Sequence, residues 1–329
     1  MAHKLILMKN GKRNDISQLI GNITRTSNID TLGEELSFDC VYNDSRFFSN
    51  LDVIDIGDQV VLTNDDKIIN YFVVVTSSVN GRTNKTFTCF DRAWYLNKNE
   101  TIIQFKKASA SQAIEKLLDK FSVKHRIDKM TPLITKIYKD MVVSDIIRDI
   151  LDQVQQETGK KYRLEMDKDV VVVANQANLL IKPTDRLSSN TNSFPIASTV
   201  NNPSRELSIQ DMKNKVIVAA DGDDNTKIYA EKSDTNSISK YGLLTEVVTV
   251  DSKNAAQARN IAANTLKDLN KISETISCDM LGNDDVRAGR LIDINEPITG
   301  IVGRYLIKSA THTINNGIHR VSVELEVMA

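Results

Sequence analysis

Cysteine, proline and tryptophan are scarce in this sequence, and long apolar runs are missing. Its 329 residues include three cysteines, five prolines and one tryptophan. Cys40, Cys89 and Cys278 are odd in number and far apart, so we interpret them as three buried, reduced thiols. No apolar run is long enough to cross a bilayer, and the apolar stretch at residues 5–8 is too short for a signal peptide. We therefore expect a protein made in the cytoplasm without a signal peptide and with no membrane insertion of its own.

An excess of either charge is also lacking. The chain carries 42 basic and 43 acidic residues, which gives a net charge of -1. Such balance argues against a dedicated binder of nucleic acid or of an anionic membrane, because the chain has no excess of positive charge to attract either partner. The length suits two or three domains, and an apolar fraction of 41% allows a sizeable core.

Recognisable catalytic motifs are missing as well. The sequence has no phosphate-binding glycine loop and no Gly-x-Ser-x-Gly elbow. Asp221, Asp223 and Asn225 match the first ligands of a calcium loop, but Thr226 stands where that loop needs glycine and Lys232 where it needs glutamate. We interpret this stretch as a solvated hairpin turn. A carboxylate pair for glycoside cleavage cannot be chosen from spacing alone, because such pairs meet only in three dimensions.

The histidines give little more. His312 and His319 flank one hairpin and can meet across it, but two histidines alone are a weak metal site, and we interpret them as exposed strand residues. The sequence therefore predicts no enzyme, with no catalytic, cofactor-binding or metal-binding residues and no cofactor.

The sequence contains one pattern of strands that occurs twice, at residues 55–90 and 286–328. Each copy has a glycine-led strand, a tyrosine-led strand, an Asn-Gly turn and a closing strand with period-two alternation. Asn-Gly between alternating runs is a strong hairpin signal. The alternatives are a chance likeness between two β-meanders and one small β-barrel present twice. The matching positions are Gly57, Tyr71 and Asn80-Gly81 in the first copy, and Gly289, Tyr305 and Asn316-Gly317 in the second.

The segment between the two copies has a different character. Apolar residues at helical spacing predict a helix over residues 109–121, behind serines that can cap it, and a second helix over 144–154 that Gly159 ends. Residues 162–173 read as a hairpin, which completes a small helix-helix-hairpin domain. Residues 183–205, rich in Ser, Asn and Thr, are typical of a linker.

Two sets of residues resemble a known family. Residues 90–100 (FDRAWYLNKNE) and the helix that starts near Ser109 resemble the XkdQ/YqbQ-type tail proteins of Bacillus and Clostridium prophages. The second half resembles the hub proteins of Mu-type and T-even contractile tails, at residues 237–242 (SISKYG), 287–290 (RAGR) and 300–312 (GIVGRYLIKSATH). The resemblance covers nearly the whole chain. It is fairly specific at residues 90–100 and looser in the C-terminal half.

The resemblance, taken with the patterns above, predicts a mainly β fold with an α+β insertion. We expect a first tube-type β-barrel at residues 1–98, the α+β inserted domain at 99–182, a loop or linker at 183–205, and a second β-barrel at 206–329 with a helix at about 252–270. Two tandem tube-type barrels would thus stand in one chain.

For function, the resemblance implies the structural baseplate hub of a contractile injection system. In that family three copies form a ring, so a homotrimer would present six barrels to the hexameric tail tube and a three-fold face to the central spike, as a symmetry adapter. Further implied partners are a tube-initiator protein, baseplate wedge and LysM-type tail proteins, and a tape measure or DNA that passes the channel without sequence-specific binding. Made in the bacterial cytoplasm, the protein would assemble into the baseplate of a virion, or of a phage-tail-like bacteriocin such as a clostridial diffocin.

Two other functions stay open. One is a tail-associated cell-wall-binding or peptidoglycan-degrading protein that uses the inserted domain to bind the wall. The other is the trimeric spike itself, although no short β-helical repeat period is visible in the sequence.

Overall fold

The computed structural model describes residues 3–41, 53–81, 84–186, 191–220, 227–250 and 256–327. The chain divides into a larger unit, Met1–Ser204 with Ser277–Glu326, and a smaller unit, Arg205–Ile276 with Val327–Ala329. It leaves the larger unit within strand β16 (Asn201–Ser208) and returns to it within β20 (Ser273–Leu281). Among the residues described, no helix combines the length and the apolarity needed to cross a membrane.

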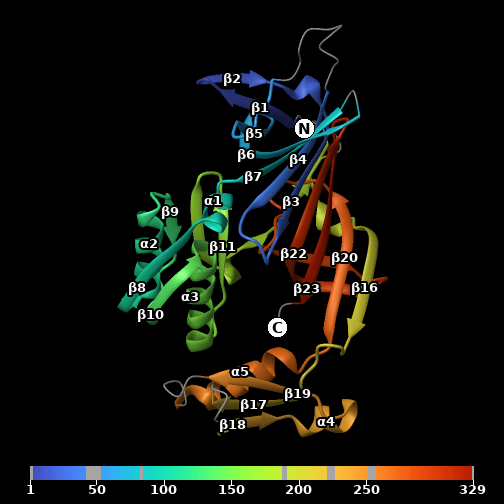
Figure 1. Ribbon diagram of the computed structural model, residues 1–329. Helices are drawn as coiled ribbons and strands as arrows, with labels where there is room; N and C mark the ends of the chain where they lie inside the picture. Colours follow the sequence, from blue (N-terminus) through green and yellow to red (C-terminus); the bar gives the residue numbers. More distant parts are fainter. Residues whose placement is uncertain are drawn as a thin grey trace. The chain divides into compact units, whose positions relative to one another are not determined.

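The larger unit is built on a 13-stranded sheet in the order β16-β20-β23-β22-β3-β4-β7-β6-β5-β1-β2, with β21 paired to β22 and β13 to β21 (Figure 1). This bears out the mainly β fold. The pairings form an open path between β2 and β16, and in the described ranges no pairing closes either half into a barrel. The strands are β1 (His3–Lys9), β2 (Lys12–Asp15), β3 (Ile20–Asn28), β4 (Glu34–Val41), β5 (Gln59–Asn64), β6 (Lys67–Asn80), β7 (Asn84–Asp91), β13 (Leu180–Ile181), β21 (Leu291–Glu296), β22 (Ile301–Asn315) and β23 (Ile318–Val327).

The repeated pattern has the same local structure in both copies. Strands β5-β6-β7-β4-β3 of the first copy match β21-β22-β23-β20-β16 of the second in order. The N–H of Gly57 donates to the carbonyl of Val74 at 2.8 Å, and the N–H of Gly289 donates to the carbonyl of Ile307 at 2.8 Å. A second bond runs in the opposite direction in each copy. The N–H of Val74 donates to the carbonyl of Asp58, and the N–H of Ile307 donates to the carbonyl of Arg290, both at 2.9 Å. This agreement favours a repeated module over a chance likeness.

Both copies belong to one continuous sheet. Strand β22 of the second copy pairs with β3 of the first in antiparallel register, with Thr311 opposite Thr26 and His312 opposite Arg25. Residues 277–326, which we expected in a second domain with 206–276, thus lie in the same unit as the N-terminal strands.

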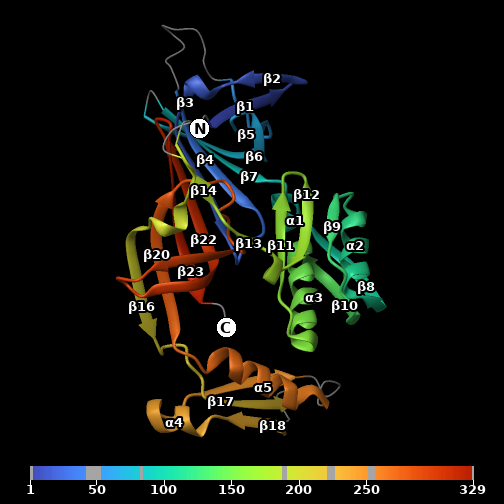
Figure 2. The same ribbon diagram turned by 180° about the vertical axis from the view of Figure 1, so that it is seen from behind.

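The inserted α+β domain follows the predicted plan with three added strands, β8, β9 and β10. The side chain of Ser109 and that of Gln112 form a reciprocal capping box at the start of α2, and Gly159 ends α3 in the left-handed conformation. The β11–β12 hairpin is also confirmed. The β8–β10 pair was not predicted. Figures 1 and 2 show α2 and α3 with the strands around them. The elements are α1 (Ala93–Lys98), β8 (Glu100–Ser109), α2 (Ala110–Lys120), β9 (His125–Ile127), β10 (Leu133–Val142), α3 (Val143–Thr158), β11 (Tyr162–Asp167) and β12 (Val170–Asn175).

The smaller unit is a three-stranded sheet with a helix on one face. Strand β17 lies between β18, to which it is antiparallel, and β19, to which it is parallel. Helix α5 packs against the sheet through Ala258, Ala262 and Leu266, which contact Val216 and Val218. The helix expected at about 252–270 is therefore present. The elements are β17 (Lys215–Ala220), β18 (Ile228–Ser233), α4 (Thr235–Tyr241), β19 (Thr245–Val250) and α5 (Ala258–Leu269).

Short elements complete the chain. The predicted linker contains β14 paired with β15, and part of it, residues 187–190, lies outside the described ranges. These elements are 3-10 helices η1 (Ser17–Leu19), η2 (Gln176–Asn178) and η3 (Ile196–Ser198), and strands β14 (Thr184–Asp185) and β15 (Phe194–Pro195).

Candidate functional site

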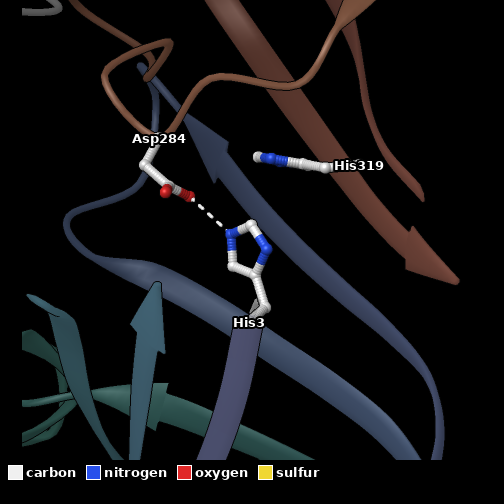
Figure 3. A group of neighbouring side chains, drawn as sticks. All are labelled: His3, Asp284 and His319. Atoms are coloured by element: carbon white, nitrogen blue, oxygen red, sulfur yellow. Dashed lines mark hydrogen bonds and ion pairs between the residues drawn. The ribbon is translucent and has the colours of Figure 1, made fainter. Parts of the chain in front are cut away.

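A group of buried and half-buried polar side chains lies where β1 meets the second copy of the module. We call it the histidine cluster. Figure 3 shows three of its members, contributed by the start of β1, the turn between β20 and β21, and strand β23. The cluster consists of His3, Arg25, Asn64, Asp284, His312 and His319.

Asp284 receives most of the hydrogen bonds in the cluster. Its Oδ1 lies 3.2 Å from Nε2 of His3, and its Oδ2 accepts from Nδ2 of Asn64 at 2.7 Å. Its carbonyl oxygen accepts from Nη2 of Arg25 at 3.1 Å. The side chain of Arg25 is 1% exposed, so this guanidinium is a buried charge whose countercharge is Asp284.

The two hairpin histidines are linked by a hydrogen bond, and their contacts bear on their tautomers. Nε2 of His312 lies 2.7 Å from the carbonyl oxygen of Val286 and 3.0 Å from Nη2 of Arg25. Because the carbonyl is the shorter contact and can only accept, we assign the proton to this nitrogen, which leaves the contact with Arg25 without a shared hydrogen. Nδ1 of His312 is then an acceptor, and it receives the N–H of His319 Nε2 at 2.9 Å. His319 consequently has a bare lone pair on Nδ1, and that buried atom has no hydrogen-bond partner in the described part of the chain.

The electrostatics of the cluster follow from its burial. Burial and the charge of Arg25 hold the pKa of His312 well below its usual range, and burial lowers the pKa of His319 to about 4. Burial alone would raise the pKa of Asp284, but the hydrogen bond from His3, the charge of Arg25 and the bond from Asn64 hold it below its usual range. At neutral pH the carboxylate is therefore charged and both hairpin imidazoles are neutral.

The expectation for the two hairpin histidines was half right. His312 and His319 do meet across the hairpin, as their spacing allowed. The interpretation as exposed residues is wrong, since they are 1% and 7% exposed. Period-two alternation contains the missed signal, because His319 shares a strand face with Val321 and Val323.

The other cluster members were missed altogether. Arg25 shares a strand face with Ile23, and a charged residue on an apolar face was a usable signal. Nothing in the sequence points to His3 or to Asp284. Cys40, Cys89 and Cys278 are buried and form no disulfide with one another, as expected. The calcium-like stretch at residues 221–226 lies outside the described residues.

A second polar group joins the inserted domain to the repeated module. Arg290 Nη2 lies 3.1 Å from Oε1 of Glu165 on β11, and Arg287 Nη2 lies 3.8 Å from the same oxygen. Arg287 also approaches Glu34 of β4, with Nη1 and Oε1 4.0 Å apart. Burial lowers the pKa of Arg287, but the charges of Glu34 and Glu165 outweigh it and raise that pKa. The RAGR segment is thus an ion-pair anchor for the insertion.

The other segment that carries the resemblance, residues 90–100, supplies a buried carboxylate. Asp91 is 1% exposed, and it accepts hydrogen bonds from the backbone N–H of Ala93 at 3.0 Å and of Glu34 at 2.9 Å. Burial and the neighbouring charge of Glu34 raise the pKa of Asp91 to about 7. Asp91 therefore connects the end of β7 to the start of β4 at the point where helix α1 begins.

Changing Gly282 to alanine is expected to distort the histidine cluster. A methyl group on Gly282 would overlap the imidazole ring of His319, whose carbonyl accepts the N–H of Gly282 at 2.9 Å. We expect a loss of about 2 kcal/mol in the free energy of unfolding, measured by denaturant titration. Gly21→Ala is the matched control, because its added carbon would lie 3.5 Å from the nearest atom, Cβ of Asp39. Equal losses in the two variants would contradict this account of the site.

Comparison with known proteins places these features in a family. A model of the family described as YQBQ-like matches residues 23–326. The chain is 25% identical over 245 residues to protein YqbQ of Bacillus subtilis (strain 168), which covers 73% of this chain and 72% of that protein. It is 23% identical over 253 residues to the phage-like element PBSX protein XkdQ of the same strain, with coverage of 73% and 72%.

A solved structure shares the fold. The 43 kDa tail protein of prophage MuSo2 from Shewanella oneidensis is similar with a TM-score of 0.71 and 12% sequence identity, and the likeness covers 98% of each chain. The family match includes both copies of the module and the insertion between them. This chain therefore belongs to the YQBQ-like family.

Proposed function

We propose that this chain is a structural protein of a contractile tail, and that it is the baseplate hub that joins the hexameric tail tube to the trimeric central spike. The observation that carries the proposal is the duplicated strand module, with the same strand order and the same glycine hydrogen bonds in both copies. Three chains carry six such modules, so a homotrimer matches a hexameric ring on one face and a three-fold partner on the other.

The open sheet supports assembly into a ring. All four residues of β2, at one end of the sheet, are exposed, and most residues of β16, at the other end, are exposed as well. Unpaired strand edges are templates for pairing with another chain, and natural proteins keep them covered. A ring of copies set edge to edge would cover them.

The relatives support the same role. XkdQ is named as a protein of a phage-like element, and the similar solved structure is a prophage tail protein. On this proposal the partners are two further copies of the chain, the tail tube or a tube-initiator protein, the central spike, and wedge and LysM-type proteins of the baseplate. A tape measure or DNA would pass through the channel without sequence-specific binding. The chain would act in the baseplate of a virion or of a bacteriocin such as a diffocin, and not as an enzyme.

Imaging of the assembled baseplate tests this proposal. We expect three copies between tube and spike, with the modules built on β5–β7 and β21–β23 at similar radii from the particle axis. A stable dimer in the assembled particle would contradict the proposal, as would modules at clearly different radii.

One observation favours the alternative of a wall-binding tail protein. The β8–β10 pair of the insertion leaves three large apolar side chains exposed, Ile102 at 62%, Leu133 at 61% and Ile137 at 53%. Apolar surface of this kind is typical of an interaction site. Purified protein mixed with peptidoglycan separates the two functions, since the hub should neither pellet with the wall material nor clear its turbidity.

A further inference from the structure

We propose that His3, Asp284 and His319 form a binding site for a divalent transition-metal ion, for which Zn²⁺ is the probe. The site is independent of the proposed hub function. It departs from the expectation of no metal-binding residues, which considered His312 and His319 without His3 and Asp284.

The three side chains lie close together, and one pair of them stands at metal-binding distance. One possible ligand atom from each lies within 4.8 Å of the others. Nε2 of His3 and Oδ1 of Asp284 are 3.2 Å apart. Two ligands about 2.0 to 2.1 Å from a tetrahedral Zn²⁺ are about 3.3 Å apart, so this pair forms one edge of the tetrahedron without rearrangement. Figure 3 shows the ring of His319 beside that pair.

The third ligand is available because His319 has a free lone pair. Its Nε2 is used in the bond to His312, and the remaining Nδ1 is buried with no hydrogen-bond partner. Within the described ranges, seven buried side-chain nitrogen or oxygen atoms lack a hydrogen-bond partner, and two acceptors among them belong to the histidine cluster: Oδ1 of Asn64 and Nδ1 of His319. Buried polar groups are normally satisfied, so this concentration indicates that the cluster holds a further polar species.

Surrounding groups orient the ligands as second-shell partners do in metal sites. With the proton of His312 assigned to Nε2, His312 donates to the carbonyl of Val286 and accepts from Nε2 of His319, so Nδ1 of His319 is bare. Asn64 holds Oδ2 of Asp284 and leaves Oδ1 for the ion. Binding replaces the proton between His3 Nε2 and Asp284 Oδ1, so His3 changes to the tautomer with its proton on Nδ1.

Two imidazoles and one carboxylate select the kind of ion. This donor set suits zinc and similar first-row divalent ions, with water in the fourth position, and it is too poor in oxygen for calcium. Arg25 opposes the ion, because its Nη1 lies only 3.7 Å from Oδ1 of Asp284. We therefore expect weaker binding than at a closed four-ligand structural zinc site.

The bound ion would link β1 to β23 and to the turn between β20 and β21. His3 and Asp284 are 281 positions apart, and His319 lies further along, on the second copy of the module. An ion held by all three binds the folded state and not the unfolded chain, so it raises the melting temperature.

Calorimetric titration of the metal-free, untagged full chain with ZnCl₂ tests the site. We expect one ion per chain in the wild type. His3→Gln and His319→Gln should each weaken binding by about tenfold or more. His125→Gln is the matched control, because His125 lies on β9, outside the cluster, and bonds the carbonyl of Val123; this variant should bind Zn²⁺ as the wild type does.

Melting curves with and without Zn²⁺ give a second readout. Zinc should raise the melting temperature of the wild type and of His125→Gln but not of His3→Gln. If His319→Gln does not fold, as judged by circular dichroism, His3→Gln alone decides. No zinc binding by the wild type would overturn the proposal, and so would unchanged affinity in His3→Gln.

Discussion

Replacing Gly289 with alanine is expected to lower the free energy of unfolding by about 3 kcal/mol, clearly more than the same change at Gly57. The two glycines occupy equivalent positions in the repeated module, with φ of 86° and 91°. An alanine in this left-handed region costs about 1 to 2 kcal/mol at either site. At Gly289 the added methyl group would also overlap Nε, Cδ and Cγ of Arg163, whereas at Gly57 it meets nothing within 4 Å.

The overlap at Gly289 is costly because Arg163 cannot move away freely. Its Nε is buried, and Nη1 donates to the carbonyl of Ile29 at 2.9 Å. Forcing extra volume into such a site costs about 1 to 3 kcal/mol. Denaturant titration of both variants measures the difference directly, and Gly57→Ala acts as the internal control for backbone strain. Equal destabilisation would show that Arg163 yields without cost and that Gly289 is needed for its φ alone.

Asp91→Ala is expected to cost about 3 kcal/mol, with a size that depends on pH. The change leaves the N–H groups of Glu34 and Ala93 without their acceptor in a buried place, at roughly 1 to 3 kcal/mol each. The pKa of Asp91 is raised to about 7 in the folded protein, above its usual value near 4. The contribution of this carboxyl group to stability is therefore full below about pH 4 and is lost progressively as pH rises from there through 7.

The pH dependence gives a sharp test. The difference in unfolding free energy between wild type and Asp91→Ala should be larger at pH 5 than at pH 8, and the subtraction removes titrations common to both proteins. Asp39→Ala is the control, since Asp39 is half-buried and accepts only a side-chain bond, from Thr86 at 2.9 Å. It should cost less than about 1 kcal/mol at both pH values. If the difference in unfolding free energy between wild type and Asp91→Ala grew with pH, the carboxyl group of Asp91 would not have a raised pKa in the folded protein, and this explanation would be wrong.

Local signals in the sequence predicted local structure well. The capping serine at 109, the terminal glycine at 159 and the Asn-Gly turn at 316–317 each set a backbone conformation by themselves, and the structure has them there. The repeat was visible in the sequence because both copies need glycine at the same position, where Gly57 and Gly289 have a positive φ and make the same backbone hydrogen bonds. The β8–β10 pair was missed because its alternation is broken by two register shifts.

Long-range arrangements could not be predicted in the same way. The pairing of β3 with β22 joins both module copies in one sheet. No residue pattern in either strand predicts which strand it pairs with. The histidine cluster depends on that pairing, since it sets Arg25 opposite His312. From the sequence alone one can infer that His312 and His319 meet, because a single hairpin connects them. The contributions of His3 and Asp284 come from the tertiary fold.

The β3–β22 pairing also has a consequence for biosynthesis. Arg25 and His312 are 287 positions apart, so at about 5 to 20 residues per second the ribosome needs about 15 to 60 s after making β3 before its neighbour emerges. During that interval one side of β3 is an unpaired edge. Nascent chains on the same messenger would present this edge to one another, so slow translation favours an exchange of β22 between chains over completion of each sheet by its own chain.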